Sequence, residues 1–161
     1  MTETRTIQMY TDGAARGNPG PGGYGVILIS GNHRKELSQG YRKTTNNRME
    51  LMAVIAGLEA LKKEGMNITI FTDSQYIAKA INEGWLKNWI ATQFKGGKKN
   101  KDLWMLFDEL AQRHHIKFIW VKGHADNPLN NRCDELATAA ADGKGLLIDE
   151  EYEKDKNTLF G

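Results

Sequence analysis

Residues 7–30 read IQMYTDGAARGNPGPGGYGVILIS and hold the pattern that decides the fold. The first six residues alternate apolar and polar side chains, which is the period of a half-buried strand. The turn-rich stretch Gly13–Gly23 contains two of the three prolines in the chain, and Tyr24–Ser30 predicts a second strand. A short link that reads as a hairpin follows, so Lys35–Tyr41 is expected to return as a third strand. These three strands predict an antiparallel meander.

After this meander the apolar period changes to that of a helix. Apolar residues recur at helical spacing from Asn46 to Lys63, with Thr45 among the candidate caps and Gly65 as the expected stop. The rest of the chain predicts the strand Asn67–Thr72, the helices Ser74–Glu83 and Asp102–Arg113, the strand Ile116–Val121 and the helix Leu129–Asp142. Three strands followed by alternating helices and strands predict an α/β fold, a mixed sheet with helices on its faces. We expect one domain at residues 1–143 and a poorly ordered tail at 144–161.

Composition excludes several classes of protein. A chain of 161 residues fits one domain, and 40% hydrophobic with 26% charged residues is ordinary for a globular protein. No apolar run approaches the roughly 20 residues of a membrane helix, and the N-terminus lacks the apolar core of a secretory signal. The single cysteine, Cys133, excludes an internal disulfide and fits a reducing compartment. These features predict a cytoplasmic protein without a membrane segment.

Positive charge is concentrated in one segment. Residues 84–101 carry five lysines and no acidic residue, and Trp85, Trp89 and Phe94 lie among them. Lysines release counterions from a phosphate backbone, and aromatic rings pack on sugars or bases, so the segment suits nucleic acid. The alternative is a solvated loop, which charge alone does not exclude.

Four acidic residues occupy positions where burying a carboxylate costs free energy. Asp12 and Asp73 follow similar strand sequences, MYTD and IFTD, so two neighbouring strands would bring both carboxylates to one edge. Glu50 sits in the apolar first turns of a helix, and Asp134 lies on a helix with small residues one turn on. Partly buried carboxylates need a positive partner, and a cluster of oxygen ligands favours Mg²⁺ or Mn²⁺ over zinc. Each acid taken alone also fits a cap or a surface residue.

A set of motifs in fixed order gives the most specific signal. They are TDG at 11–13, GNPGPGGYG at 17–25, TTNNRMEL at 44–51, TDSQY at 72–76, WVKGHA at 120–125 and NRCDELA at 131–137. Together they closely resemble bacterial RNase H type 1 (ribonuclease HI) over about residues 5–142. The resemblance implies the RNase H-like fold, a five-stranded mixed sheet of three antiparallel and then two parallel strands, flanked by helices.

The resemblance also implies a reaction, the endonucleolytic cutting of the RNA strand of RNA–DNA hybrids to 5′-phosphate and 3′-hydroxyl products. The four metal-binding acids of the family fall on Asp12, Glu50, Asp73 and Asp134, and its flexible-loop histidine falls on His124. Two Mg²⁺ ions are implied, with Mn²⁺ as a substitute. Asp12 would be shared by both ions, Asp134 would complete the nucleophile's site, and Glu50 with Asp73 the leaving-group site.

Substrate contacts follow from the same motifs. The resemblance assigns Asn46 and Gln75 to the RNA minor groove, Asn18 and Thr45 to a pocket for a DNA phosphate, and Asn47 with Trp85 to the DNA strand. The segment 84–101 matches the basic protrusion of the family, which implies contacts from Trp85, Trp89, Lys87, Lys95, Lys98 and Lys99. That protrusion is a few residues shorter than in well-known bacterial members. Ala14-Ala15 stands where many relatives have Ser-Cys. The chain resembles the free-standing enzyme, and we expect a monomer.

Other signals and functions compete with this interpretation. Gly20–Gly25 matches the dinucleotide fingerprint G-x-G-x-x-G but leads into a strand, so turn formation explains its glycines. His114 and His115 point to opposite faces of a strand, and Cys133 reads as a buried small hydrophobe. A hybrid-binding module without catalysis, or an integrase-like or Holliday-junction nuclease of the same fold, remains an alternative function.

Overall fold

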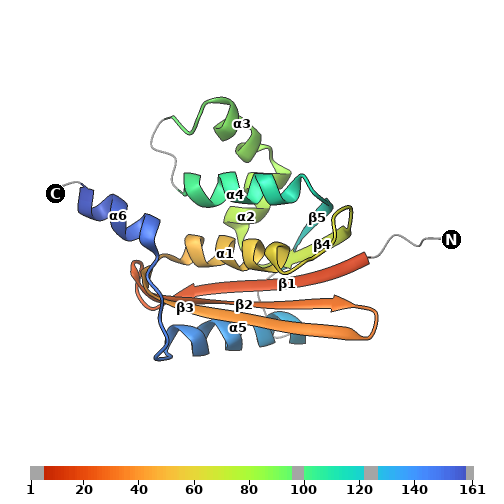
Figure 1. Ribbon diagram of the computed structural model, residues 1–161, viewed down its shortest axis with the longest axis horizontal. Helices are drawn as coiled ribbons and strands as arrows, with labels where there is room; N and C mark the ends of the chain where they lie inside the picture. Colours follow the sequence, from red (N-terminus) through yellow and green to blue (C-terminus); the bar gives the residue numbers. More distant parts are fainter. Residues whose placement is uncertain (1–5, 96–99, 122–126, 159–161) are drawn as a thin grey trace.

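The computed structural model describes residues 6–95, 100–121 and 127–158, with only the backbone described at 155–158. It contains one sheet with helices on both faces (Figure 1). The strands are β1 (Thr6–Ala15), β2 (Gly20–Ser30), β3 (His33–Thr44), β4 (Asn67–Thr72) and β5 (His115–Trp120). The helices are α1 (Asn46–Glu59), α2 (Gln75–Asn82), α3 (Trp85–Ala91), α4 (Lys101–Ala111), α5 (Pro128–Ala141) and α6 (Glu150–Thr158).

The five strands lie in the order β3-β2-β1-β4-β5. β1 pairs antiparallel with β2, and β2 pairs antiparallel with β3. β4 then pairs parallel with β1, and β5 parallel with β4. The predicted mixed sheet of three antiparallel and two parallel strands is therefore confirmed.

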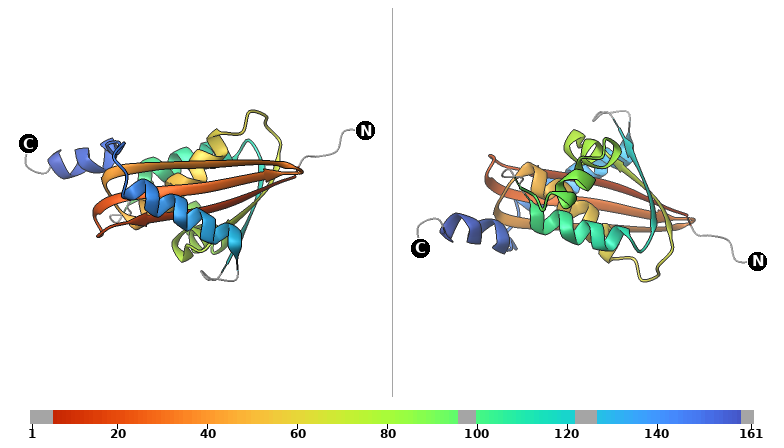
Figure 2. Two further views of the ribbon diagram at one scale, coloured as in Figure 1. Left: turned by 90° about the horizontal axis from the view of Figure 1, so that it is seen from below. Right: turned by 90° about the horizontal axis from the view of Figure 1, so that it is seen from above.

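Helices cover the two faces of the sheet unequally. Helices α1 to α4 stack on one face, and α5 lies alone across the other (Figures 1 and 2). The main core lies under α1 and α4, where Met9, Leu51, Ile70 and Trp104 are fully buried. Because α1 is packed between the sheet and α4, most of its residues are buried, and its position is fixed by the core. Among the described residues, none of the helices combines the length and the apolar character that crossing a membrane requires.

Helix α1 is shorter than its apolar spacing predicts. It ends at Glu59 rather than near Lys63, because the chain turns at Ala60 and Leu61, where the Leu61 N–H donates to the Leu58 carbonyl, and residues 62–64 are exposed. Past this turn, Gly65 adopts a left-handed conformation, with φ of 73°, and its N–H donates to Arg113 at 2.7 Å. The predicted stop at Gly65 therefore marks the end of a loop and not of the helix.

Part of the chain after Gly143, for which we expected poor order, contacts the rest of the domain. Leu147 exchanges backbone hydrogen bonds with the β3 residues Gly40 and Arg42, both of 2.9 Å. Asp149 is buried against Arg48 of α1, with an ion pair of 2.7 Å. These contacts dock residues 147–149 on β3 and α1, so this part of the C-terminal segment packs against the domain.

Candidate active site

Two parallel strands carry the first two acids. The register pairs Met9 with Ile70 and Tyr10 with Phe71. Asp12 and Asp73 each follow two residues after the second of these pairs. The Tyr10 and Phe71 rings stack with centroids 4.5 Å apart, as expected from the matching MYTD and IFTD sequences. Asp12 does not end its strand, since β1 continues to Ala15, whereas β4 stops at Thr72. Because the pairing of β1 with β4 ends at Tyr10 and Phe71, the edge of β1 at Asp12 is not covered by β4.

The first turns of α1 bring Glu50 to the same edge. Thr45 caps the helix, with its hydroxyl accepting the Arg48 N–H at 3.2 Å. The helix approaches β1 so closely that a Cβ at Gly13 would overlap the backbone of Met49 and Glu50. The Gly13 N–H donates both to Asp12, at 2.9 Å, and to Glu50. Glycine after Asp12 thus allows one backbone N–H to hold two carboxylates.

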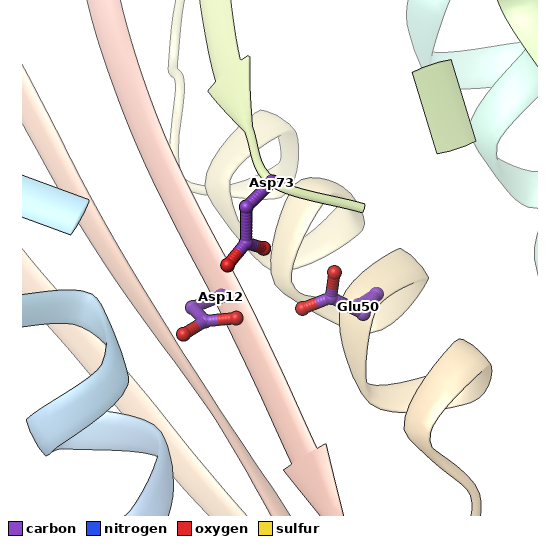
Figure 3. A group of neighbouring side chains, drawn as sticks. All are labelled: Asp12, Glu50 and Asp73. Carbon is purple, nitrogen blue, oxygen red and sulfur yellow. The ribbon is translucent and has the colours of Figure 1, made fainter. Parts of the chain in front are cut away.

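Asp12, Glu50 and Asp73 form a compact cluster (Figure 3). Each offers a carboxylate oxygen, and these oxygens lie within 4.8 Å of one another. Burial raises the pKa of Glu50 well above its usual value, and the Asp12 charge adds to that effect. Burial also raises the pKa of Asp12 to about 7, with the charges of Asp73 and Asp134 acting in the same direction and the Gly13 N–H opposing. The pKa of Asp73 is raised too, chiefly by burial.

Such a cluster requires protons or a cation. None of the ion pairs formed by the described residues includes Asp12, Glu50 or Asp73. Like charges held this close in a partly desolvated place repel strongly. A donor set made only of carboxylate oxygens suits a hard divalent cation such as Mg²⁺ or Mn²⁺. The residues present therefore fit a divalent-metal site.

The fourth predicted acid, Asp134, comes from the opposite face of the sheet. It lies on α5, next to the fully buried Cys133, and lines the same cleft as the other three. Helix α5 packs directly on β2, where a Cβ at Gly25 would overlap the Cys133 carbonyl. Ala137 is fully buried here, and its small side chain lets the helix approach the sheet closely. Asp134 itself is exposed and stands outside the group of three whose oxygens lie within 4.8 Å.

An open cleft of about 440 Å³ surrounds the acids. It is lined by Asp12, Gly13, Asn46, Asn47, Glu50, Asp73, Ser74, Gln75, Tyr76 and Asp134. Beside it, Asn18 accepts the Asn46 N–H at 3.1 Å, and Asn46 accepts the Ala15 N–H at 2.7 Å. Of the predicted substrate residues, Asn46, Asn47 and Gln75 line the cleft, whereas Asn18 contacts it through Asn46 and Thr45 caps α1 beside it.

Comparison with known proteins identifies the family. A sequence model of the RNase H family matches residues 4–142. The chain belongs to the RNase H family. It is 55% identical to a ribonuclease H of Desulforamulus reducens over 152 residues, covering 92% of this chain and 95% of the relative. It is 51% identical to a ribonuclease H of Trichodesmium erythraeum over 158 residues, covering 95% and 100%. The chain is accordingly an endoribonuclease of the hydrolase class.

Solved structures of RNase H proteins share this fold. LC9-RNase H1, described as a type 1 RNase H with the type 2 active-site motif, superposes with a TM-score of 0.79 at 29% identity, covering 96% of this chain and 82% of that protein. LC11-RNase H1, solved in complex with an RNA/DNA hybrid, superposes with a TM-score of 0.63 at 27% identity, covering 84% and 96%. The predicted resemblance to RNase H type 1 is confirmed.

The described part of segment 84–101, which the resemblance matched to a basic protrusion, has a helix that the sequence did not predict. Trp85 and Trp89 lie on α3, and the Trp89 ring packs near Phe94 and Trp104, at 6.4 and 5.9 Å between centroids. Phe94 is buried, so its ring is not available to bases, while Trp85 remains 40% exposed. Trp85 and Trp89 are four residues apart, and this helical spacing could have predicted the helix.

Some of the predicted substrate contacts lie in the described part of segment 84–101, and others lie outside the described residues. Lys87 and Lys95 are exposed, as a phosphate-binding role requires. Lys98 and Lys99 lie outside the described residues, and so does His124.

Two residues beside the acid cluster were not predicted as site residues from the sequence. Tyr76 lines the cleft, and its hydroxyl accepts the Trp104 indole N–H at 2.7 Å. Trp120 donates its indole N–H to the backbone carbonyl of Asp73 at 3.2 Å. Both lie inside motifs already quoted for the family, and those motifs were the signal that could have found them.

The discounted residues behave as expected. Cys133 is fully buried, burial raises the pKa of its thiol to about 12, and its Sγ donates to the Tyr10 carbonyl at 3.3 Å. His114 accepts the Met66 N–H at 3.2 Å through Nδ1, which is a structural contact. Gly20–Ser30 forms one continuous strand, so no helix N-terminus follows the glycine-rich motif.

Proposed function

We propose that this protein hydrolyses the RNA strand of RNA–DNA hybrids by two-metal-ion catalysis, giving 5′-phosphate and 3′-hydroxyl products. The supporting observation is the partly desolvated group of Asp12, Glu50 and Asp73, whose ligand oxygens lie within 4.8 Å and which has no Lys or Arg ion pair within the described ranges. The hybrid-bound relative LC11-RNase H1 supports the choice of substrate. Magnesium is the proposed metal, and Mn²⁺ would substitute for it.

Each acid has a proposed role in holding the metal. Two bound divalent ions would supply an activated water and stabilise the leaving oxygen. We assign Asp12 as the common ligand because it is the more buried aspartate of the cluster and interacts with Glu50, Asp73 and Asp134. Asp134 completes the nucleophile's side, from α5. Glu50 and Asp73 complete the leaving-group side, where α1 and β4 hold them.

The neighbouring polar groups are proposed to orient the hybrid. Asn46 and Gln75 border the acids and contact the RNA strand in the minor groove, where 2′-hydroxyls both donate and accept hydrogen bonds. Asn18 and Thr45 hold a phosphate of the DNA strand, with Asn47 and Trp85 beside it. These contacts address the backbone, so little base specificity is expected.

Two further parts of the site complete the proposal. Lys87, Lys95, Lys98, Lys99 and Trp89 of the protrusion contribute to holding the substrate, chiefly through the phosphate charge. His124 is proposed to shuttle a proton or to assist product release.

One gel experiment tests this function. The protein is incubated with end-labelled RNA–DNA hybrid, double-stranded RNA and double-stranded DNA, each with Mg²⁺ and with EDTA. We expect cutting only of the RNA strand of the hybrid, and only with the metal. Glu50→Gln should nearly abolish cutting, whereas Glu59→Gln, an exposed acid on the same helix, should leave it unchanged. Binding without cleavage would favour a non-catalytic hybrid-binding module, and DNA cutting an integrase-like or Holliday-junction nuclease.

We also propose a cellular setting. Cys133 is the only cysteine and is buried as a free thiol, which fits the reducing cytoplasm. The active site draws all its acids from one chain, so a monomer suffices. Removal of RNA primers and of R-loops is the proposed role of such an activity.

A further inference from the structure

A partly exposed tryptophan stands directly beside the acid cluster. Trp120 is the last residue of β5 and is 42% exposed. Its indole N–H donates to the Asp73 carbonyl at 3.2 Å, and its strand neighbour is Thr72. This bond holds one edge of the ring against the strand end that carries Asp73, while the exposed part of the ring faces solvent.

The exposed part of Trp120 lines a groove against α2. The groove has a volume of about 330 Å³ and is formed by Gln75, Ala78, Lys79, Asn82, Glu83 and Trp120. Gln75 lines both this groove and the active-site cleft. The groove is therefore a lateral extension of the cleft, on the side of Asp73. No residue of α3 is among those that line it.

The groove combines the groups that bind a nucleotide. An aromatic ring offers a stacking surface for a base, and such stacking tolerates any base. Lys79 is exposed one turn along α2 from Gln75, where an ammonium can reach a phosphate. The amides of Gln75 and Asn82 can each donate to and accept from a base edge. A volume of about 330 Å³ is at the lower end for ligand pockets, which suits one nucleotide.

We propose that this groove binds an unpaired nucleotide of the RNA strand, at the point where that strand leaves the hybrid. The inference rests on the proposed function. Bases within a hybrid stack on their neighbours, so only an unpaired base is free to stack on Trp120. The RNA strand is the occupant because the groove adjoins Asp73 and Gln75, which lie on the side of the cleft that meets the strand to be cut.

One acidic residue of the groove opposes this occupant. Glu83 lies one turn after Lys79, at the C-cap of α2, and is exposed. Its charge repels a phosphate bound near Lys79 and weakens the subsite. Replacing it with a neutral residue of the same shape should therefore strengthen binding of the unpaired nucleotide.

Binding of matched substrates tests the proposal. The Asp12→Asn protein, which does not cut, is titrated in Mg²⁺ with a blunt hybrid and with the same hybrid carrying a short unpaired extension. The extension is placed on the RNA strand or on the DNA strand, at either end. We expect an extension at one end of the RNA strand to lower the Kd about tenfold, the size expected for one stacked base. The DNA extensions should leave the Kd unchanged.

Paired variants separate stacking from the hydrogen bond to Asp73. Trp120→Ala and Trp120→Phe both lose the indole N–H, but only Trp120→Phe keeps a ring. We expect Trp120→Ala to remove the gain from the extension and Trp120→Phe to retain most of it. Lys79→Ala should reduce the gain in affinity from the extension, and Glu83→Gln should increase it. Lys62→Ala, which replaces an exposed lysine after α1, is the control and should leave the gain unchanged.

The results that overturn the proposal are distinct from those that overturn the function. Equal Kd values for blunt and extended hybrids, or a gain that persists in Trp120→Ala, would refute the subsite. A gain from the DNA extension alone would refute the choice of strand. Failure of the unsubstituted protein to cut a blunt hybrid would instead refute the proposed function.

Discussion

Replacement of Asp149 by alanine should destabilise the protein strongly, because it breaks a buried ion pair. The Arg48 side chain is 4% exposed and the Asp149 side chain 2%. Arg48 donates to Asp149 through Nε at 2.7 Å and Nη2 at 2.9 Å, and Thr44 donates its hydroxyl to the same carboxylate at 2.8 Å. Removing one partner of such a pair leaves a buried charge and typically costs about 3–5 kcal/mol.

The expected loss is at the lower end of that range. Arg48 keeps Asp102 as a second partner, with two hydrogen bonds of 2.9 and 2.7 Å, and Asp102 is one-third exposed. We therefore expect the free energy of unfolding to fall by about 3 kcal/mol. For a chain of this length, that corresponds to a fall in Tm of about 6–12 °C.

Urea unfolding measures this effect. The Asp149→Ala midpoint should fall while the slope m is unchanged, which identifies a change in stability. Glu153→Ala, which breaks the ion pair of the same segment with the exposed Arg42 of β3, is the matched control and should have a much smaller effect. An Asp149→Ala protein as stable as the unsubstituted one would refute the reasoning that the C-terminal segment is fastened to α1.

Further predictions concern the acids, the thiol and the protrusion. The pKa of Asp12 in the folded protein is raised to about 7, above its unfolded value near 4. The free energy of unfolding in EDTA should therefore fall as pH rises from about 4 to 7. Asp12→Asn should flatten that decline in thermal melts and nearly abolish cleavage. Gly13→Ala should reduce cleavage severely in the gel assay, because its Cβ would push α1 away from β1. Cys133 should resist a thiol reagent at pH 8 until the protein unfolds, since burial raises its pKa to about 12. Replacing Lys87 and Lys95 by alanine should weaken hybrid binding and lower the slope of log Kd against log salt by about one to two; an unchanged slope would remove both from the contact surface.

The parts of the fold that repeat a local pattern could be predicted from the sequence. The matching segments before Asp12 and Asp73 predicted neighbouring strands, and the stacked rings of Tyr10 and Phe71 confirm it. Glu50 was identified because a carboxylate within an apolar run has no reason to be buried unless it binds something.

Features that depend on distant partners could not be predicted. The contact between Arg48 and Asp149 joins residues 101 positions apart, and neither residue has a local pattern that names the other. The groove at Trp120 requires the placement of β5 beside α2, which the motifs did not show. Helix α3 was not predicted because the lysines of segment 84–101 favoured a loop on charge, although the two tryptophans of α3 have helical spacing.

The position of a bound metal tests the central claim most directly. Crystals grown with Mn²⁺ and measured for anomalous scattering would locate the ions without reference to activity. The account predicts a peak at about 2.1 Å from carboxylate oxygens of the Asp12, Glu50 and Asp73 cluster, and a second peak roughly 4 Å from it, on the Asp134 side, when a hybrid is bound. Manganese bound only elsewhere on the protein, with no peak at this cluster, would contradict the account.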